Sequence, residues 1–427
     1  MHISLLSLQD FRGFRELFLP LHPKLNIVYG VNGTGKSTIL DATAILLSWL
    51  ASRIRMHNGK GKFPTESEIH NDALLTQLSL TLGCKNKQTH WQIVKRRRGR
   101  NIRDAKVSRT SLVFLSNLAQ EIRGSNFAEG EVLSLPVFAH YSVHRAVLCP
   151  KAKHGGWNFL APFSADVYAL PGDADFPAFL AWLSGPECLG EENQRRNSRS
   201  AGKKSSVVKE SSKRSSSFFR ALSLVMPDHD LPVPPQGADG EDDFRLAFEQ
   251  LSEGDKCLVA LVGDMALRLT AANPQSEDPL LGEGIFLIDE VDLHLHPYQQ
   301  QTVVPGLLAA FPHCQFLIST NSPLVLGSAK GGLCFCLDEG SDAPHNIVPL
   351  EMPYGKNVDR VLQDQMGLAT TRPPLVAELL TRIYQDIERK AYTSAQFRID
   401  ALERLIGNDP ELCWVRQLIK RCELLGK

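Results

Sequence analysis

A glycine-rich stretch at residues 29–42, YGVNGTGKSTILDA, has the residue types and spacing of a phosphate-binding loop. Gly30, four further residues and then Gly35-Lys36-Ser37 match the pattern GxxxxGK[ST] in full. Glycines let backbone N–H groups turn towards phosphate oxygens, the lysine neutralises the terminal phosphates, and the serine hydroxyl ligates magnesium. The alternative is a glycine-rich turn that carries Lys-Ser by chance. We expect nucleotide contacts from Gly30, Asn32, Gly33, Gly35, Lys36, Ser37 and Thr38.

Two adjacent acids, Asp289 and Glu290, end the apolar run GIFLIDE at residues 284–290. An acid at the tip of a buried strand can hold magnesium through its water shell, and the next acid faces the position of an attacking water. A plain polar end to a strand is the alternative. The pair predicts a metal-assisted hydrolysis of the bound nucleotide.

A third stretch, QLSEGDK at residues 250–256, places Ser252 and Gly254 at the start of an apolar helix. A helix N-terminus is an anion site, but the subunit already has its phosphate-binding loop. We therefore expect Ser252 and Gly254 to grip the γ-phosphate of a nucleotide from across a dimer interface. An ordinary N-cap at Ser252 is the alternative.

The elements that must position these residues follow from the hydrophobic pattern. LNIVYG (25–30) is an apolar strand before the glycine-rich turn, and a helical pattern runs from Ser37 to about Met56. GIFLIDE and CQFLIST (314–320) indicate central strands covered on both faces. Residues 74–100 alternate on both sides of CKNKQ and predict a hairpin. From Pro373 the chain reads as amphipathic helices.

The composition is that of a globular protein without membrane spans. The 427 residues are 43% hydrophobic and 22% charged, and Lys plus Arg balances Asp plus Glu at 47 each. We find no spanning segment and no secretory signal. Nine scattered cysteines do not suggest a disulfide framework. The protein is predicted to be cytoplasmic and not membrane-bound.

The domain organisation is predicted from shifts in composition. Residues 190–217 are serine-rich and basic with little apolar content, which predicts a flexible insertion. The expected parts are the N-terminal half of the catalytic domain with a β-hairpin lobe, the insert, the C-terminal half, and a helical tail for dimer or partner docking or for capping the core. Their bounds are 1–185, 186–217, 218–350 and 351–427.

The predicted hairpin ends in five basic residues, which are Lys95, Arg96, Arg97, Arg98 and Arg100. They have two readings, a solvated hairpin tip or a contact with the phosphate backbone of DNA or RNA. Two histidine pairs invite a metal reading. They are His294 with His296 and His140 with His144, and neither has a third ligand at suitable spacing.

Four ordered motifs, GVNGTGKST, LSEGDK, LIDEVDLHLHP and LISTNSPLVL, together resemble the ABC-type ATPase heads of the RecF, SMC and overcoming-lysogenization-defect group. The resemblance covers residues 1 to about 330, apart from the insert. It implies an α/β fold: a P-loop ABC-type ATPase head, with a mixed sheet, helices on both faces, an N-terminal β-rich lobe, a helical insertion and a C-terminal helical tail. It also implies a head-to-tail homodimer, or a higher oligomer, around ATP and Mg²⁺.

The resemblance implies roles for individual residues. Lys36 and Glu290 would be catalytic, Ser37 and Asp289 would hold the metal, and Ser252 and Gly254 would reach the other subunit's γ-phosphate. Arg12 and Arg145 would be further nucleotide-pocket candidates, although an isolated arginine is more often a surface or ion-pair residue. Asn321 departs from the group's Thr-His-Ser-Pro, in which the histidine senses the γ-phosphate. Asparagine can hydrogen-bond phosphate but cannot move a proton, so we expect slow hydrolysis of ATP to ADP and phosphate.

Within the group, TILDATAILLSWL, PVFAHYSVHRAV and YGKNVDRVLQDQMG look like the ATPase subunits of Septu and retron anti-phage systems. That resemblance implies an HNH-type nuclease partner, and in a retron a reverse transcriptase with its RNA and DNA. We find no nuclease signature in this chain. Three functions stay open: an ATPase that controls a partner nuclease or toxin, a nucleotide-gated scaffold with little turnover, and a RecF-like DNA-repair ATPase.

Overall fold

The structure is a computed structural model that describes residues 1–84, 87–98, 109–127, 134–146, 169–170, 216–227, 250–337, 347 and 349–425. It divides into two compact units, Met1–Lys356 and Asn357–Lys427. All the predicted nucleotide motifs lie in the first unit. The low-complexity insert lies outside the described residues except for positions 216 and 217, so its flexibility and the predicted domain boundaries stay predictions.

A six-stranded sheet forms the centre of the first unit. Its order is β10-β9-β3-β8-β7-β6, with β10 antiparallel to β9 and the other neighbours parallel. The strands are β3 (Leu25–Gly30), β6 (Val137–Tyr141), β7 (Gly284–Ile288), β8 (Cys314–Thr320), β9 (Leu333–Leu337) and β10 (Leu350–Glu351). Every residue of β6, β7 and β8 is buried, as the apolar runs predicted for β7 and β8.

The register of the parallel strands brings the motifs to one edge of this sheet. Tyr29 of β3 lies opposite Thr320 of β8, and Ile288 of β7 lies opposite Ile318 of β8. The glycine-rich loop, the acid pair and Asn321 each follow the carboxyl end of one of these strands. Because the strands are parallel, all three segments leave the sheet at the same edge.

A second, four-stranded antiparallel sheet forms the N-terminal lobe, in the order β2-β1-β4-β5. Its strands are β1 (His2–Phe11), β2 (Phe14–Pro20), β4 (Leu75–Cys84) and β5 (Lys87–Arg96). The hairpin predicted around CKNKQ is confirmed, since β4 pairs with β5 from Leu75 opposite Arg96 to Cys84 opposite Lys87. The lobe therefore presents one continuous sheet to the helix that follows the glycine-rich loop.

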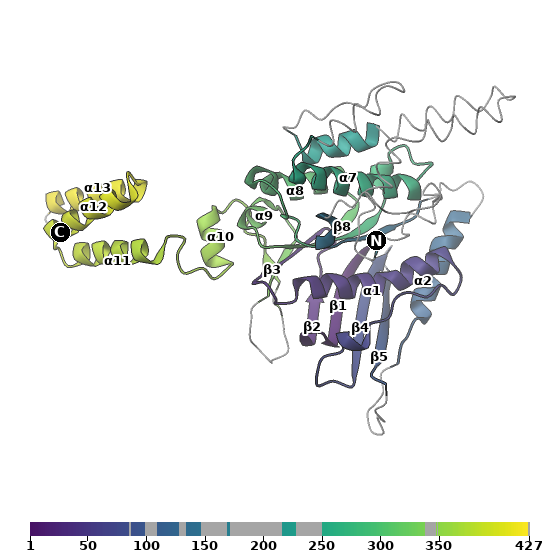
Figure 1. The fold of residues 1–427 in the computed structure, drawn as a ribbon. Coiled ribbons are helices and arrows are strands. Elements are labelled where there is room, and N and C mark those ends of the chain that lie inside the picture. The colour runs from purple at the N-terminus through teal and green to yellow at the C-terminus, as the bar shows by residue number, and fades with distance from the viewer. Residues whose placement is uncertain are drawn as a thin grey trace. The chain divides into compact units, whose positions relative to one another are not determined.

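Helices cover both faces of the central sheet, which confirms the predicted fold class. Figure 1 shows α1 (Lys36–Arg55) on one side of the sheet and α7 (Glu253–Ala272) with α8 (Pro297–Ala310) on the other. α1 contacts β3, β6, β7 and β8 and also β4 of the lobe, so it lies between the two sheets. The other named elements among the described residues of this unit are α2 (Val113–Phe127), α9 (Pro323–Ser328), η1 (Glu66–Glu68), η2 (Val143–Ala146) and η4 (Pro279–Leu281). Residues 216–225 are also helical.

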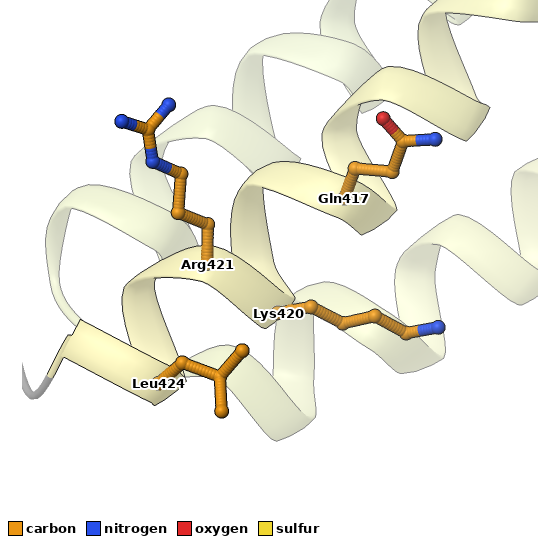
Figure 2. A pocket seen from close by; sticks show the side chains of 4 residues that line it. All are labelled: Gln417, Lys420, Arg421 and Leu424. Carbon is orange, nitrogen blue, oxygen red and sulfur yellow. The ribbon is translucent and has the colours of Figure 1, made fainter.

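The second unit is helical, as the sequence predicted for the tail. Its helices are α10 (Val358–Asp364), α11 (Pro374–Glu388), α12 (Tyr392–Ile406) and α13 (Pro410–Leu425). α11 to α13 enclose a separate core whose centre includes Ile383, Ile399 and Val415. A shallow hollow on α13 is lined by Gln417, Lys420, Arg421 and Leu424, and all four side chains come from that one helix (Figure 2). Among the described residues, no helix is both long and apolar enough to cross a bilayer.

Candidate active site

The glycine-rich loop joins β3 to α1 through backbone angles that favour glycine. Gly30, Gly33 and Gly35 have φ values of 146°, 91° and 99°. A Cβ at Gly30 would also collide with the backbone carbonyl of Leu337, and one at Gly35 would lie 2.6 Å from the Phe14 ring of β2. Gly35 is the N-cap of α1, and the first turn carries no acid and no side-chain cap. The N–H groups at this helix end are therefore open to an anion.

Lys36 lies folded across the loop. Its Nζ donates to the carbonyls of Gly30 at 2.8 Å and Val31 at 3.0 Å, and only 6% of the residue is exposed. Burial lowers the pKa of Lys36, while the charges of Glu290, Asp289 and Asp292 oppose that shift. These three acids therefore lie close enough to Lys36 for their charges to act on its ammonium group. Asn32 and Ser37 are exposed and Thr38 is half-buried, so these predicted contacts face accessible space.

The acid pair after β7 is held by Ser319 of β8. The Ser319 hydroxyl donates to Asp289 Oδ1 at 2.5 Å and accepts from the Glu290 N–H at 2.7 Å. The Asp289 N–H donates to the carbonyl of Tyr141 in β6 at 2.8 Å. Glu290 has φ 46°, a left-handed conformation that is uncommon for a residue with a side chain. Neighbouring strands thus fix both acids.

Asn321 meets the glycine-rich loop directly. Its Nδ2 donates to Asn32 Oδ1 at 3.1 Å, which joins two predicted nucleotide contacts that lie far apart in the sequence. The preceding Thr320 hydroxyl donates to Asp292 Oδ1 at 2.5 Å, and Ser322 caps α9 through its hydroxyl. The segment after β8 is therefore fixed between the loop and the turn that follows Glu290.

Ser252 and Gly254 lie at the start of α7 and make no described hydrogen bond to the glycine-rich loop, the acid pair or Asn321. Ser252 is the N-cap of α7, where its hydroxyl accepts from the Asp255 N–H at 3.2 Å and donates to Asp255 Oδ2 at 2.7 Å. Gly254 is buried against the turn at residues 291–296. Within the described residues, Ser252 hydrogen-bonds to its own helix and not to the glycine-rich loop.

Arg12 lies in the turn between β1 and β2 and is bound to two carboxylates. Its Nη1 is 2.6 Å from Asp41 Oδ2 in α1, and its Nη2 is 2.7 Å from Glu68 Oε1 in η1. Burial lowers the pKa of Arg12, but the bonds to Glu68 and Asp41 outweigh it and the pKa is raised. Arg12 thus joins the lobe to α1. The Arg145 side chain lies outside the described residues.

His140 of β6 is a buried polar residue that the sequence analysis considered only as a metal ligand. The residue is 3% exposed, its Nδ1 is 4.0 Å from Asp41 Oδ1, and its Nε2 has no hydrogen-bond partner among the described residues. Burial lowers its pKa, while the charges of Asp41 and Asp289 oppose the shift. Asp41 lies one helical turn after Ser37, on the same face of α1. His140, which lies beside Asp41, is therefore close to the predicted metal site.

Ser319 does not stand out in the sequence, and His140 stands out only as one of a histidine pair, because a hydroxyl or an imidazole inside an apolar strand has no motif of its own. The pairing of β7 with β8 predicts that Ser319 lies beside Asp289, but this register is visible only in the fold. As for the metal readings, the described residues contain no group of three or more His, Cys, Asp or Glu side chains placed to hold a metal ion. His296 instead caps α8 through its ring.

The basic run lies at the end of β5 away from the hairpin turn, so the prediction that it forms a hairpin tip is wrong, although Arg96 and Arg98 are exposed. The Arg97 Nη2 donates to the carbonyls of Ile69 and His70, each at 3.2 Å, and Arg98 is 3.6 Å from Glu66. Lys95 and Arg96 end the strand, and Arg100 lies outside the described residues. Arg97 therefore supports a neighbouring loop.

Comparisons with known proteins give one family and several relatives. The family described as the RecF/RecN/SMC N-terminal domain matches residues 2–331. The chain is 29% identical over 425 residues to the retron Vc95 probable ATPase of Vibrio cholerae serotype O1 biovar El Tor, covering 87% of this chain and 79% of that protein. It is 28% identical over 465 residues to the retron Ec83 probable ATPase of Escherichia coli, covering 94% and 82%.

A shorter match covers the Septu protein PtuA of Bacillus thuringiensis. The identity is 32% over 153 residues, which is 34% of this chain and 38% of that protein. These likenesses agree with the group to which the four sequence motifs pointed.

Proposed function

Because the chain belongs to the RecF/RecN/SMC N-terminal domain family, we propose that it binds and hydrolyses ATP between two copies of itself and so controls a partner in anti-phage defence. One observation carries the proposal: the glycine-rich loop, the acid pair and Asn321 meet at one edge of the central sheet. The names of the retron and Septu relatives support the setting in defence.

The glycine-rich loop and Lys36 would bind the phosphates of ATP. The open N–H groups at the start of α1 attract the negative charge. Lys36 donates to two loop carbonyls, and a phosphate oxygen competes for the same ammonium protons. We infer that, when ATP binds, Lys36 replaces its hydrogen bonds to the carbonyls of Gly30 and Val31 with contacts to the terminal phosphates. The backbone of the loop already has the conformation that binds phosphate.

The Ser37 hydroxyl and the Asp289 carboxylate would hold Mg²⁺, because both offer the hard oxygen ligands that this ion prefers. The ion, when bound, supplies charge neutralisation on the phosphates during transfer. The buried Nε2 of His140, which has no hydrogen-bond partner in the described part of the chain, fits a site that gains a polar group such as water on loading. Ser319 would keep the Asp289 carboxylate in the orientation needed for binding.

Glu290 would orient and deprotonate the attacking water. Its backbone is fixed by Ser319 and by the turn that follows, so the point from which its side chain extends is defined. Asn321 would hydrogen-bond the γ-phosphate from the other side of the loop, where its amide already contacts Asn32. An amide moves no proton, which supports slow hydrolysis.

Ser252 and Gly254 would complete the site of a second copy. Ser252 caps a helix whose N-terminus favours an anion, and among the described residues its hydroxyl hydrogen-bonds to Asp255. A head-to-tail homodimer gives this helix end a phosphate. The other proposed partners are an HNH-type nuclease and, in a retron, a reverse transcriptase with its nucleic acid.

The test of the ATP cycle is sedimentation and turnover of the full chain. With ATP and Mg²⁺, the Glu290→Gln variant is expected to form a stable dimer and hydrolyse little ATP. Lys36→Ala is expected to bind no ATP and stay monomeric, and Ser252→Ala to bind ATP without dimerising. A Glu290→Gln variant that remains monomeric at saturating ATP would overturn the dimer proposal.

The test of the partner is a tagged purification from native cells with the wild type, Glu290→Gln and Lys36→Ala. Recovery of a nuclease or reverse transcriptase with the wild type or Glu290→Gln supports the controller. Recovery of nucleic acid alone overturns it and favours a RecF-like repair ATPase. Arg97 donates to backbone carbonyls of its own chain. In the described part of the basic run, a repair ATPase would therefore contact nucleic acid through Lys95, Arg96 and Arg98.

A nucleotide-gated scaffold is the second candidate, and Asn321 is the observation that favours it. A site without a proton-moving group at this position can hold ATP for long periods. If the rate of single-turnover hydrolysis rises strongly in Asn321→His, the asparagine sets the slow rate. That result supports a scaffold that keeps ATP bound with little turnover. An unchanged rate counts against this explanation of slow hydrolysis.

A further inference from the structure

The start of α7 and the turn after Glu290 touch through their backbones. Gly254 is buried, and a Cβ at this position would collide with the carbonyl oxygen of His294. His294 has φ 61°, so the turn is sharply bent at the point of contact. Only glycine allows this approach, and the two segments cannot shift against each other without opening the contact.

Gln299 of α8 reinforces this contact with its side chain. It is 7% exposed, its Nε2 donates to Asp255 Oδ1 at 2.5 Å, and its Oε1 accepts from the His296 N–H at 3.0 Å. Asp255 in turn accepts the Ser252 hydroxyl at its other oxygen. One amide group therefore links the hydroxyl that caps α7 to the turn at residues 291–296.

The neighbouring Gln300 extends the link towards the nucleotide loop. Its Nε2 donates to the Leu295 carbonyl at 2.9 Å, and its Oε1 accepts from the Ser322 hydroxyl at 2.7 Å. The Ser322 N–H donates to the Thr320 hydroxyl at 3.0 Å. Between these two residues lies Asn321, which bonds to the loop. The start of α8 is thus bonded both to the α7 cap and to the segment that contacts the glycine-rich loop.

The Ser252 hydroxyl has a single proton to donate. In the structure the hydroxyl donates this hydrogen bond to Asp255. If the hydroxyl donates to a phosphate instead, its hydrogen bond to the carboxylate is lost. Asp255 is buried, and a buried carboxylate that loses a donor is costly unless its other contacts adjust. Gln299 donates to the other oxygen of that carboxylate, so a movement of the carboxylate acts directly on Gln299 and, through its bond to His296, on the turn after Glu290.

We propose that Gln299 is a positioning residue that couples the two ATP sites of the dimer. Contact between Ser252 and the partner's ATP releases Asp255, and Gln299 carries this change to the turn that places Glu290 in the same subunit. Each subunit then hydrolyses its own ATP efficiently only after it has gripped its partner's ATP. The proposal rests on the proposed function, because it requires Ser252 to act across a dimer.

Turnover of the full chain as a function of ATP concentration tests the coupling. The wild type is expected to give a sigmoidal curve. Gln299→Met removes both hydrogen bonds at similar volume, and we expect a hyperbolic curve with kcat lower by about fivefold or more, a usual size for coupling between sites. Gln301→Met, on the exposed face of the same helix, is the matched control and keeps the wild-type curve.

A reciprocal exchange separates positioning from simple loss of structure. Asp255→Asn with Gln299→Glu reverses donor and acceptor, and the new carboxylate still accepts from the His296 N–H, as glutamate does in a capping box. This double variant is expected to recover the sigmoidal curve, whereas Asp255→Asn and Gln299→Glu alone do not. Melting temperatures show whether each variant remains folded.

The outcomes separate this inference from the function beneath it. If Glu290→Gln fails to dimerise with ATP, the proposed function falls and the coupling falls with it. A different set of results overturns only the coupling. In that set, Glu290→Gln dimerises with ATP, Ser252→Ala does not, and Gln299→Met keeps both the sigmoidal curve and the wild-type kcat. Failure of the folded double variant to recover the curve also overturns the coupling.

Discussion

At the residue scale, hydroxyl and imidazole groups inside apolar strands define the site as much as the motif residues do. Ser319 joins Asp289 and Glu290 by two hydrogen bonds, and His140 lies buried beside Asp41. The glycine-rich loop and the acid pair are readable from the sequence because their spacing is local. The roles of Ser319 and His140 are not readable, because their partners come from other elements and depend on the register and the packing of the fold.

Replacing Ser319 with alanine tests its support of the acid pair. Ser319→Ala leaves Asp289 and Glu290 in place but removes the donor to one and the acceptor for the other. We expect kcat for ATP to fall by about 10–100-fold, as is usual for residues that orient metal ligands, with ATP binding retained. Thr270→Ala, which removes a buried hydroxyl from α7, is the control and leaves kcat unchanged. Equal kcat in both variants would contradict the assignment.

The buried His140 predicts a dependence of stability on pH. Burial lowers its pKa below the ordinary value of 6.5; the charges of Asp41 and Asp289 oppose this shift, and Lys62 adds to it. Below pH 6.5 the unfolded chain therefore binds a proton that the folded chain does not. The free energy of unfolding falls with decreasing pH, by at most about 1.4 kcal/mol per pH unit, until the folded-state pKa is reached.

Denaturant titrations above and below the ordinary histidine pKa measure this dependence. His140→Gln is expected to flatten the pH profile of the unfolding free energy. His144→Gln replaces an exposed histidine of the same sequence stretch and is expected to keep the wild-type profile. If the two variants have the same profile, His140 does not remain neutral in the folded chain.

At the element scale, the apolar runs predict β3, β7 and β8, and the alternating stretch predicts the β4–β5 hairpin. They do not predict the buried group that links β6 to α7. There the Tyr141 hydroxyl donates to Asp264 Oδ2 at 2.8 Å, and Arg268 Nε donates to the same oxygen at 2.6 Å. In the sequence, Asp264 and Arg268 read as the polar side of an amphipathic helix. Burial from all sides is a property of the assembled layers.

The packing of α8 against the helical segment at residues 216–225 depends on Gly306. A Cβ there would lie 2.6 Å from the Leu224 carbonyl oxygen and from the Val225 Cα. Because both are backbone atoms, Gly306→Ala must separate the two elements. We expect the free energy of unfolding to fall by about 1–3 kcal/mol in denaturant titrations.

Gly124 of α2 provides the matched control for this substitution. A Cβ at Gly124 meets no atom within 4 Å, so Gly124→Ala adds helix propensity without a clash. The expected gain is about 0.5–1 kcal/mol. A loss of similar size in both variants would show that crowding at α8 is not the cause.

At the scale of the whole molecule, the four ordered motifs predicted the ATPase head correctly, and the family match confirms it. The first unit needs all of these motifs in one fold, since they come from residues as far apart as Gly30 and Asn321. The second unit has its own core and contains none of them. Its sequence predicts helices but not their purpose, because an amphipathic pattern specifies burial and not the partner.

The separate core of the tail predicts that it can be unfolded without loss of ATP hydrolysis. Ile399 is fully buried between the helices of the tail, and Ile→Ala in a core costs about 2–5 kcal/mol. A single core of this size rarely supplies more than about 3–5 kcal/mol, so Ile399→Ala should unfold the tail. Hydrogen exchange measures that unfolding, and ATP turnover reports on the first unit.

Phe397→Ala is the control, because this neighbouring side chain is 77% exposed and its removal leaves the tail core intact. If the tail is the docking arm, Ile399→Ala retains ATP turnover but loses the partner in the tagged purification, while the tail of Phe397→Ala remains folded. Loss of turnover together with unfolding of the tail would show that the head depends on the tail. Retention of the partner by a chain with an unfolded tail would assign docking to the head.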